Sequence, residues 1–322
     1  MSASPEVSVV IPTYNAPHFL LETVQTVLDQ TFADFEVVIV NDGSTDDTAE
    51  RLGPLVERDR RVRVITQENA GIGAARNRGI DESRGKYVAL LDHDDLWMPG
   101  KLAAQVSYLQ SHPHCVACSV NWAFSTNPQH KMFDQDLICR EAGGDGTIVH
   151  RPLWQLSRGQ LFLASSSTLF DRERAAGVRF ATRRQCIEDT PFQIGLFARG
   201  AIGIADGQTI QMIYRWHASN YSKQAIFYYN GQQMLREMAG QGAFDELGPE
   251  DRADLETFLA MLGRTTAAKQ LMAGKRGMAL RAYLRELPYQ LPRMRLKFLL
   301  TFPALLLAPM SVVRRALPGE SV

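Results

Sequence analysis

Short apolar runs alternate with helical segments along the first third of the chain, and this alternation limits the fold more than any other feature. Four runs rich in Val and Ile occupy residues 7–11, 35–40, 62–65 and 87–91. A segment with apolar residues at helical spacing follows each run. Strands without a polar face are covered on both sides, and repeated strand–helix units give parallel strands with right-handed crossovers. We therefore expect an α/β fold with a doubly wound, mostly parallel sheet flanked by helices.

Polar residues stand just after each of these four predicted strands. In chain order they are Tyr14 and Asn15, Asn41 and Asp42, Asn69, and Asp92 and Asp94. The carboxyl ends of parallel strands share one edge of a sheet, and open α/β sheets bind their ligands there. Turn formation explains any one of these residues, but it explains four strand ends in succession less well. The sequence therefore predicts a ligand site at this edge.

The sharpest single motif is Asp92-His93-Asp94. Residues two apart in an extended chain face the same way, so both carboxylates can converge on one point. Hard oxygen ligands of this kind suit Mg²⁺ or Mn²⁺ that substrate phosphates also hold. We expect the next residue, Asp95, only to cap the helix that begins near Pro99 or to support the site from behind.

Four segments in series resemble the inverting family 2 glycosyltransferases of the GT-A fold. They are Val7–Asn15 (VSVVIPTYN), Val37–Asp46 (VVIVNDGSTD), Asn69–Gly79 (NAGIGAARNRG) and Tyr87–Leu102 (YVALLDHDDLWMPGKL). The resemblance is strong to about residue 115 and weaker to about residue 222. It implies a GT-A domain over residues 1–222, with a nucleotide-sugar-binding half (1–115) and an acceptor-binding half (116–222).

The resemblance also implies roles for residues of the first half. Asp42 would accept the N–H of a uracil or thymine ring, and Pro12 and Tyr14 would form the wall against that ring. Asp92 would face the ribose or the metal, and Asp94 would bind the metal, Mn²⁺ or Mg²⁺, directly. The other residues expected at the donor are Thr13, Asn15, Asn69, Arg76 and His93. For Arg76, orienting acidic groups, meeting a phosphate and forming a surface ion pair all stay open.

Two motifs of the second half complete the expected site. Glu188-Asp189 precedes a predicted helix, whose dipole favours acids there whatever their function. The resemblance implies that this catalytic pair contains the general base, and we expect Asp189 to take the acceptor proton. We also expect the helix dipole to keep Asp189 ionised near neutral pH. His217 follows a predicted strand over residues 209–214. The resemblance implies that it completes the metal shell or contacts the diphosphate, and a structural histidine is the alternative.

Other polar residues of this half are open to two interpretations. Ser165–Thr168 could face the acceptor, or could be small residues of a strand with no further role. Arg215 and Ser222 could assist on a flexible segment that closes over the donor.

Residues 223–322 read as a helical C-terminal region. Within it, residues 298–313 are strongly hydrophobic and lie between Arg293, Arg295 and Lys297 on one side and Arg314-Arg315 on the other. Sixteen residues interrupted by two prolines are shorter than the roughly 20 that a helical membrane span needs. The pattern favours shallow insertion of the segment 290–315 at an anionic membrane face. Burial against the catalytic domain or a second subunit is the alternative.

Composition narrows the function classes. Lys plus Arg equals Asp plus Glu at 35 each, so no basic field attracts nucleic acid. The segment Met1–Glu6 shows no secretion signal, and Cys115 and Cys118 lie in a predicted strand, where we expect buried structural thiols instead of a zinc or redox site. We expect a cytoplasmic enzyme, placed at the inner face of the cell membrane if its C-terminal segment binds lipid.

The expected reaction is transfer of a hexosyl or N-acetylhexosaminyl group, with inversion, from a UDP- or dTDP-sugar to a glycan or lipid-linked acceptor in cell-surface polysaccharide biosynthesis. A sugar nucleotidyltransferase is the first alternative, but it predicts a glycine-rich loop where this chain has Pro12-Thr-Tyr-Asn15. A non-catalytic nucleotide-sugar-binding module is the second. It is disfavoured because the D-x-D triplet and the Glu188-Asp189 pair are both present.

Overall fold

The computed structural model describes residues 4–16, 18–125, 148–158, 161, 163–206, 209–217, 225–292 and 295–317, together with the backbone of 137–140. The chain forms two compact units. The first comprises Met1–Pro152, Gly159–Arg183 and Glu188–Ala218, and the second comprises Leu153–Arg158, Arg184–Ile187 and Ser219–Val322. Two short segments of the first 222 residues thus group with the C-terminal helices.

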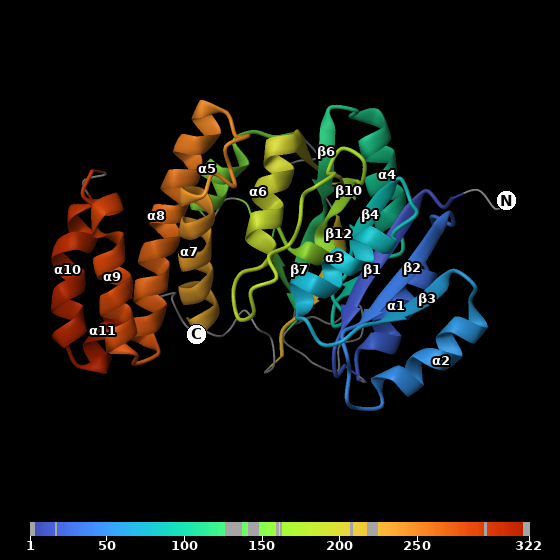
Figure 1. Ribbon diagram of the computed structural model, residues 1–322, viewed down its shortest axis with the longest axis horizontal. Coiled ribbons are helices and arrows are strands. Elements are labelled where there is room, and N and C mark those ends of the chain that lie inside the picture. Colours follow the sequence, from blue (N-terminus) through green and yellow to red (C-terminus); the bar gives the residue numbers. More distant parts are fainter. Residues whose placement is uncertain are drawn as a thin grey trace. The chain divides into compact units, whose positions relative to one another are not determined.

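An eight-stranded sheet forms the centre of the first unit (Figure 1), in the order β3-β2-β1-β4-β10-β6-β11-β9. Its strands are β1 (Val7–Thr13), β2 (Phe35–Asn41), β3 (Val62–Thr66), β4 (Tyr87–Leu90), β6 (Cys115–Ser119), β9 (Ile148–Val149), β10 (Leu169–Asp171) and β11 (Ala201–Ile204). Strands β1 to β4 run parallel to one another, and β11 runs parallel to β6. Strand β10 is antiparallel to β4 and to β6, and β9 to β11. The predicted doubly wound, mostly parallel sheet is confirmed.

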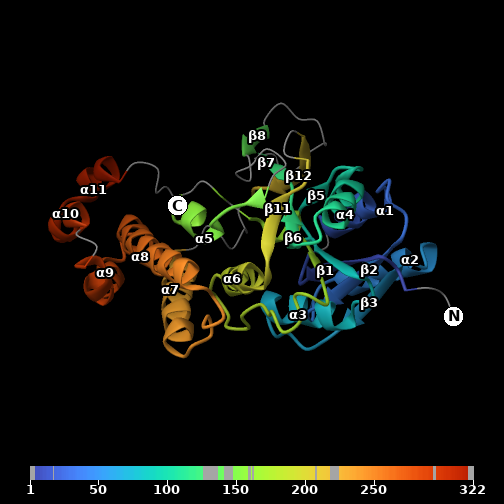
Figure 2. The ribbon, with the colours of Figure 1, turned by 90° about the horizontal axis from the view of Figure 1, so that it is seen from above.

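Helices cover both faces of this sheet, which explains why its central strands lack a polar face. They are α1 (Leu20–Leu28), α2 (Thr48–Arg58), α3 (Ile72–Glu82), α4 (Lys101–Ser111) and α6 (Asp189–Arg199). Figure 2 shows α1 and α4 on one side of the sheet and α3 and α6 on the other. Every residue of β1 and of β2 is buried, as expected for strands covered on both sides.

The strand order creates the position of the site. From β1 the chain proceeds through β2 to β3 on one side, and then crosses to β4 on the other side of β1. The strand order therefore reverses between β1 and β4, and such a switch point leaves a crevice beyond the carboxyl ends of the strands. The segments that follow β1, β2 and β4 all begin at this edge.

A second, four-stranded sheet in the same unit has the order β5-β12-β7-β8. Its strands are β5 (Leu96–Trp97), β7 (Asn121–Ser125), β8 (Leu137–Arg140) and β12 (Ile210–Arg215). Strand β12 pairs with β5 so that Ile213 lies opposite Leu96. Because β5 directly follows the acidic turn at residues 92–95, this pairing brings residues 215–217 to that turn.

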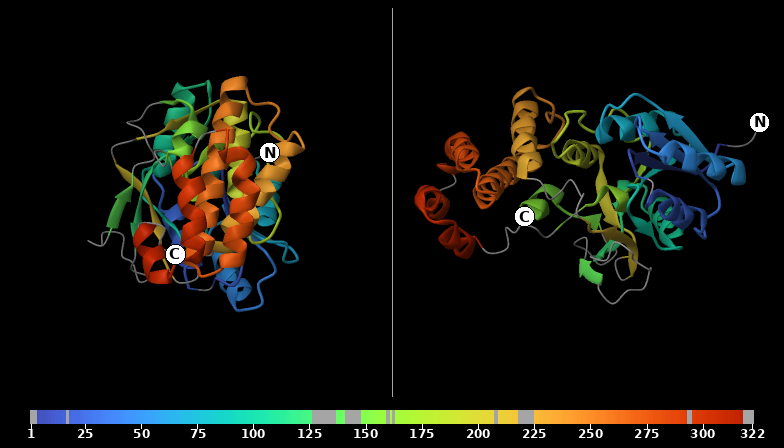
Figure 3. Two further views of the ribbon diagram at one scale, coloured as in Figure 1. Left: turned by 90° about the vertical axis from the view of Figure 1, so that its left-hand side faces the viewer. Right: turned by 90° about the horizontal axis from the view of Figure 1, so that it is seen from below.

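The second unit is helical. It contains α5 (Pro152–Ser157, except its first residue), α7 (Ala225–Gly240), α8 (Pro249–Met272), α9 (Arg276–Gln290), α10 (Leu296–Leu307) and α11 (Met310–Ala316), and Figure 3 shows α7 to α11 from two further sides in orange to red. Tyr283, Phe302 and Val313 belong to the apolar core shared by α8 to α11. Within the described ranges, no helix is both long enough and apolar enough to cross a membrane.

Candidate active site

The loops after β1 and β2 are joined to each other. Asn15 adopts a left-handed backbone (φ 49°); its N–H donates to Ser44 Oγ (3.1 Å), and its side-chain oxygen accepts from the Thr45 N–H (2.8 Å). Tyr14 is exposed, whereas Pro12 and Thr13 are buried. The Thr13 hydroxyl has no hydrogen-bond partner within the described residues. Asn15 therefore shapes the rim of the site through its side chain, and Tyr14 presents a ring to solvent.

Asp42 lies at the end of β2 with its carboxylate held in place from one side. Oδ1 accepts from Gln67 Nε2 (2.8 Å) and from the Ala70 N–H (2.9 Å), while Oδ2 accepts from the Gly71 N–H (2.8 Å). Asn69 donates to the Asp42 carbonyl (2.9 Å) and so fixes the same loop. Two carboxylate oxygens offer about four acceptor sites. With three of them used, Oδ2 keeps one for a further donor.

Arg76 connects the two halves of the expected site. Its Nη2 lies 2.6 Å from Asp92 Oδ1 and its Nη1 lies 2.7 Å from Glu188 Oε1. The side chain is only 3% exposed and lies over the Phe180 ring. Burial disfavours the charged form, but the charges of Asp92 and Glu188 outweigh it and raise the pKa of Arg76. The expectation of a surface ion pair is wrong, and the contacts with Asp92 and Glu188 fit the alternative that Arg76 orients acidic groups, which stays a prediction.

Gly73 explains how α3 brings Arg76 so close to Glu188. A Cβ atom at this position would lie 2.0 Å from the Ala181 carbonyl oxygen, which no side chain tolerates. The Ala181 N–H in turn donates to the Glu188 carbonyl (3.1 Å). Helix α3 therefore packs directly on the backbone that leads into the Glu188-Asp189 pair.

Asp94 and His217 lie side by side, with 2.9 Å between Asp94 Oδ2 and His217 Nε2. Burial opposes ionisation of Asp94, but the hydrogen bond with His217 and the charges of His93 and His217 together outweigh it, so the pKa of Asp94 lies below its usual value. Two cis ligands of an octahedral ion, each about 2.1 Å from it, are about 3 Å apart. The observed separation fits such a pair of Mn²⁺ or Mg²⁺ ligands, provided that Nε2 is unprotonated.

The side chains that the structure describes do not form a complete metal cage. No group of three or more His, Cys, Asp and Glu side chains within the described ranges is arranged to hold a metal. Asp92, the other expected metal ligand, directs Oδ1 to Arg76. Ions of this class usually keep only one or two carboxylate ligands, with substrate phosphate and water completing the shell. The site therefore fits a metal that binds together with a diphosphate.

Asp95 supports the acidic turn from within the protein. Its Oδ2 accepts from Ser166 Oγ (2.5 Å) and its Oδ1 from the Arg215 N–H (3.2 Å). Ser166 Oγ also accepts from the Asp92 N–H (3.0 Å). Burial, together with the neighbouring Asp94 and Asp92, raises the pKa of Asp95 well above its ordinary value. The capping expectation is wrong, because β5 lies between Asp95 and α4, and the supporting alternative is confirmed.

The sequence 165–168 is neither a strand nor open to an acceptor. Ser165–Ser167 forms a 3₁₀ turn, η1, and Ser166 and Ser167 are fully buried. Ser166 bonds to the acidic turn, and Ser167 Oγ lies 2.7 Å from Ser119 Oγ. The strand expectation is therefore wrong, and these hydroxyl groups serve internal packing.

Arg215 does not lie on a mobile cover. It is 1% exposed, lies over the Phe19 ring, and donates to Thr23 Oγ1 (2.8 Å) and to the Asp94 carbonyl. Thr23 also donates to the His93 carbonyl (2.9 Å). Arg215 thus anchors the acidic turn on α1, and the expected donor-side role is replaced by a positioning one. Ser222 lies outside the described residues.

Glu188 and Asp189 begin α6, as predicted. Burial raises the pKa of Glu188 to about 7, although Arg76 opposes the shift. Burial also raises the pKa of Asp189, against Arg76 and against the backbone N–H groups of the helix N-terminus. The expected influence of the helix end is therefore present but smaller than that of burial. Within the described residues Asp189 makes no ion pair, whereas Glu188 is held by Arg76.

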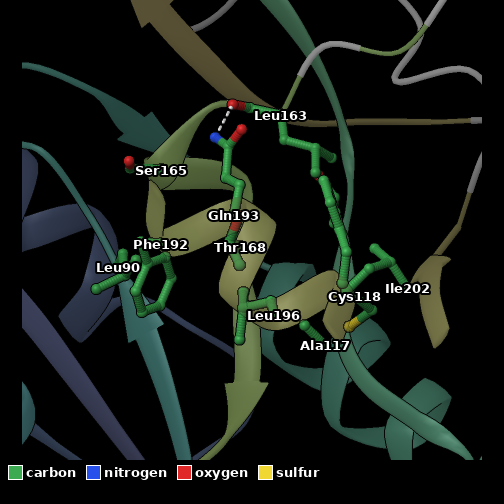
Figure 4. A pocket seen from close by; sticks show the side chains of 12 residues that line it. Leu90, Ala117, Cys118, Leu163, Ser165, Thr168, Phe192, Gln193, Leu196 and Ile202 are labelled. Atoms are coloured by element: carbon green, nitrogen blue, oxygen red, sulfur yellow. Dashed lines mark hydrogen bonds between the residues drawn. The ribbon is translucent and has the colours of Figure 1, made fainter. Parts of the chain in front are cut away.

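A small cavity lies between the sheet and α6 (Figure 4). Its lining includes Leu90, Cys118, Thr168, Phe192 and Gln193, and none of the residues expected at the donor, the metal or the catalytic pair. Gln193 Nε2 closes it on one side by donating to the Leu163 carbonyl (2.8 Å). Cys115 and Cys118 are buried free thiols, and burial raises the pKa of Cys118. Both thiols lie buried in β6, as expected.

A doubly wound sheet of this order, with an acidic turn beyond its switch point, is the GT-A fold. The model of glycosyl transferase family 2 matches residues 8–181, more than half of the chain. The chain belongs to this family.

Individual relatives match shorter segments. TuaG, a Bacillus subtilis glycosyltransferase assigned to teichuronic acid biosynthesis, is 42% identical over 106 residues, which is 33% of this chain and 42% of TuaG. For three Rickettsia glycosyltransferases the matched segment spans 15% to 20% of the relative's length. The chain thus corresponds to less than half of these relatives.

Solved structures match over most of the chain. S. aureus TarS, residues 1–349, has a TM-score of 0.62 at 18% identity, over 86% of this chain and 80% of that one. The mannosyltransferase PcManGT of Pyrobaculum calidifontis has a TM-score of 0.58 at 17% identity, over 99% and 89%. At these identities the similarity concerns the fold alone.

Proposed function

We propose that this protein is an inverting glycosyltransferase that moves a sugar from a UDP- or dTDP-sugar to a hydroxyl group of a glycan or lipid-linked acceptor. The observation that carries the proposal is the bridge made by Arg76, which contacts Asp92 of the donor motif at 2.6 Å and Glu188 of the acidic pair at 2.7 Å. A donor-binding carboxylate and a candidate base pair therefore belong to one site. A non-catalytic binding module has no need for the candidate base pair.

The donor base would bind at the ends of β1 and β2. Asp42 Oδ2 keeps one acceptor position for a ring N–H, and the exposed Tyr14 ring offers a surface for stacking. A solved TarS complex contains UDP-GlcNAc, which supports a uridine nucleotide. The PcManGT complex contains GDP-Man, and guanine also carries a ring N–H, so GDP-mannose belongs in any donor panel.

The diphosphate would bind beside Asp94 and His217, with Mn²⁺ or Mg²⁺ between them. PcManGT was solved with Mn²⁺. When bound, the ion neutralises the charge that develops on the diphosphate as the glycosidic bond breaks. Asp94 would be held in place for this role, because Arg215 donates to the Asp94 carbonyl and the Arg215 N–H donates to Asp95.

Asp189 would act as the general base. It makes no ion pair within the described residues, and its raised pKa makes it a stronger base than an exposed aspartate. It would take the proton of the acceptor hydroxyl as that oxygen attacks the anomeric carbon from the side opposite the diphosphate, which inverts the centre. Glu188 would keep Arg76 in place.

We also propose that the enzyme serves cell-surface polysaccharide synthesis and works in the cytoplasm, at the inner face of the cell membrane. The assignment of TuaG to teichuronic acid biosynthesis supports the first part. A lipid-linked acceptor would be reached most readily at that surface, which supports the second.

Donor turnover with and without Mn²⁺ tests the proposal. UDP-glucose, UDP-GlcNAc, dTDP-sugars and GDP-mannose are each screened by thermal shift and by release of nucleoside diphosphate. We expect Mn²⁺-dependent stabilisation by one donor, followed by its slow hydrolysis. Binding without metal and without turnover would favour the binding module, and release of pyrophosphate from a sugar phosphate and a nucleoside triphosphate would favour a nucleotidyltransferase.

A further inference from the structure

Helix α10 is apolar on its outer as well as its inner face. Inside the second unit, Leu299 and Phe302 are buried, and the Tyr283 hydroxyl of α9 donates to the Leu299 carbonyl (2.8 Å). On the outside, Leu296, Leu300 and Leu307 are 54%, 72% and 87% exposed. Steps of four and seven residues place these three leucines on one stripe of the helix. A helix that is hydrophobic all round is normally covered on every side.

Helix α9 and the residue after it repeat this arrangement. Leu280, Leu284 and Leu291 are exposed and follow the same steps of four and seven residues, while Ala279, Ala282 and Tyr283 face the core. Six exposed leucines within 28 residues (280–307) exceed the single apolar residues that are normal on a protein surface. The outer side of these two helices therefore has the composition of a contact surface.

The charge around the stripe indicates what covers it. No Asp or Glu occurs between Leu287 and Gly319, whereas five basic residues do: Arg293, Arg295, Lys297, Arg314 and Arg315. Four of them are described, all four are exposed, and none forms an ion pair with another described residue. A second copy of this chain would bring the same uncompensated positive charge to a symmetric contact. An anionic lipid surface supplies the opposite charge together with an apolar interior.

We propose that the outer face of α10 (Leu296, Leu300 and Leu307), together with the exposed Arg295, Lys297, Arg314 and Arg315 that flank the helix in the sequence, docks onto the anionic surface of a phospholipid bilayer. The helix has 12 residues, about 18 Å at 1.5 Å per residue, so it lies in the plane of the interface with its leucines at the acyl boundary. The inference deepens the membrane location proposed above and rests on that proposal for its cellular meaning.

Sedimentation of the full chain with vesicles tests this surface. One set of vesicles is pure phosphatidylcholine, and a second contains 30% phosphatidylglycerol. We expect binding only to the second set, and weaker binding as salt increases. Replacing Leu300 and Leu307 by Gln should lower the partition coefficient about 10-fold or more, because both side chains leave the acyl boundary. Arg314→Gln with Arg315→Gln should lower it about 20- to 30-fold, since each charge contributes to attraction at the surface.

Matched control variants replace exposed Arg and Leu side chains at other positions of the chain. Arg60→Gln with Arg84→Gln also removes two exposed charges, and Leu21→Gln removes an exposed leucine of α1; neither should change vesicle binding. Mn²⁺-dependent donor turnover, measured on the same samples, reports on the proposed function separately. Equal binding to both vesicle sets, or loss of binding in the controls, would overturn the proposal. So would a concentration-dependent dimer that Leu300→Gln with Leu307→Gln dissociates, because that would assign the face to a second copy.

Discussion

Asp94 Oδ2 and His217 Nε2 lie 2.9 Å apart, although 123 residues separate them in the chain. One belongs to the turn after β4 and the other follows β12, so the second sheet brings them together through the pairing of β12 with β5. A carboxylate and an imidazole at this distance suit one divalent ion from two sides.

The first prediction concerns this pair. Asp94→Asn should weaken Mn²⁺-dependent donor binding and lower kcat by about 10²-fold, because the diphosphate loses its main neutralising charge. Calorimetric titration of the donor with and without Mn²⁺ measures the effect. His217→Ala should reproduce it in part, whereas His114→Ala, which removes a histidine of the segment before β6, should not. If donor binding by Asp94→Asn depended on Mn²⁺ as it does in wild type, Asp94 would be excluded as a metal ligand.

The second prediction separates the base from donor binding. Asp189→Asn should leave donor affinity almost unchanged and lower transfer by about 10²-fold or more. Donor affinity by thermal shift and transfer by nucleotide release are compared in the same preparation. Glu188→Gln is the matched variant, and it should keep measurable transfer because Gln can still accept from Arg76. An equal loss of donor binding in Asp189→Asn would contradict its role as the base.

The third prediction concerns Arg76, which is buried between Asp92 and Glu188. Arg76→Ala should lower the free energy of unfolding by about 3–5 kcal/mol, since it leaves two partly buried carboxylates without their shared cation. Urea denaturation measures the change. Among the described residues, the exposed Arg78 on the same helix forms an ion pair with Glu82 alone, so Arg78→Ala should cost less than about 1 kcal/mol. A similar loss of unfolding free energy in both variants would show that the ion pairs of Arg76 with Asp92 and Glu188 have no special stabilising role.

The fourth prediction follows from the pKa of Glu188, which burial raises to about 7 from an ordinary value of 4.5. Between these values the native state binds more protons than the unfolded state, so this carboxyl group makes the protein less stable as pH rises from 4.5 to 7. Relative to Glu188→Gln, wild type should lose about 1–3 kcal/mol of unfolding free energy across this window. Parallel pH curves for the two proteins would show that the shift is absent.

The donor half of the site could be predicted from sequence because its signals are local. Runs of Val and Ile mark the parallel strands, and helix α2 (Thr48–Arg58) follows the second run, as predicted. The polar residues after β1, β2 and β4 lie at one edge because the topology of parallel strands requires it. The same local pattern placed Glu188 and Asp189 at the start of a helix, where the structure has them.

Residue roles that depend on partners far away in the sequence could not be predicted from local motifs. Asp95 bonds to Ser166 and Arg215, which are 71 and 120 residues away, and a local motif carries no information on either. The expected charge state of Asp189 rested on the helix end alone, whereas burial, a property of the whole fold, has the larger effect on its pKa. A pair such as Arg76 and Glu188 becomes visible only when the packing of α3 is known.

The close contact of Gly73 with Ala181 has a practical consequence for engineering. Chimeras that join the donor half of one family member to the acceptor half of another are an obvious route to new sugar linkages. At this point the two halves touch backbone to backbone, with space for no side chain at residue 73. A graft that brings in a bulkier residue, or a differently shaped segment around residue 181, would move α3 away from its neighbour. The crossover should therefore keep both sides of this contact from one parent.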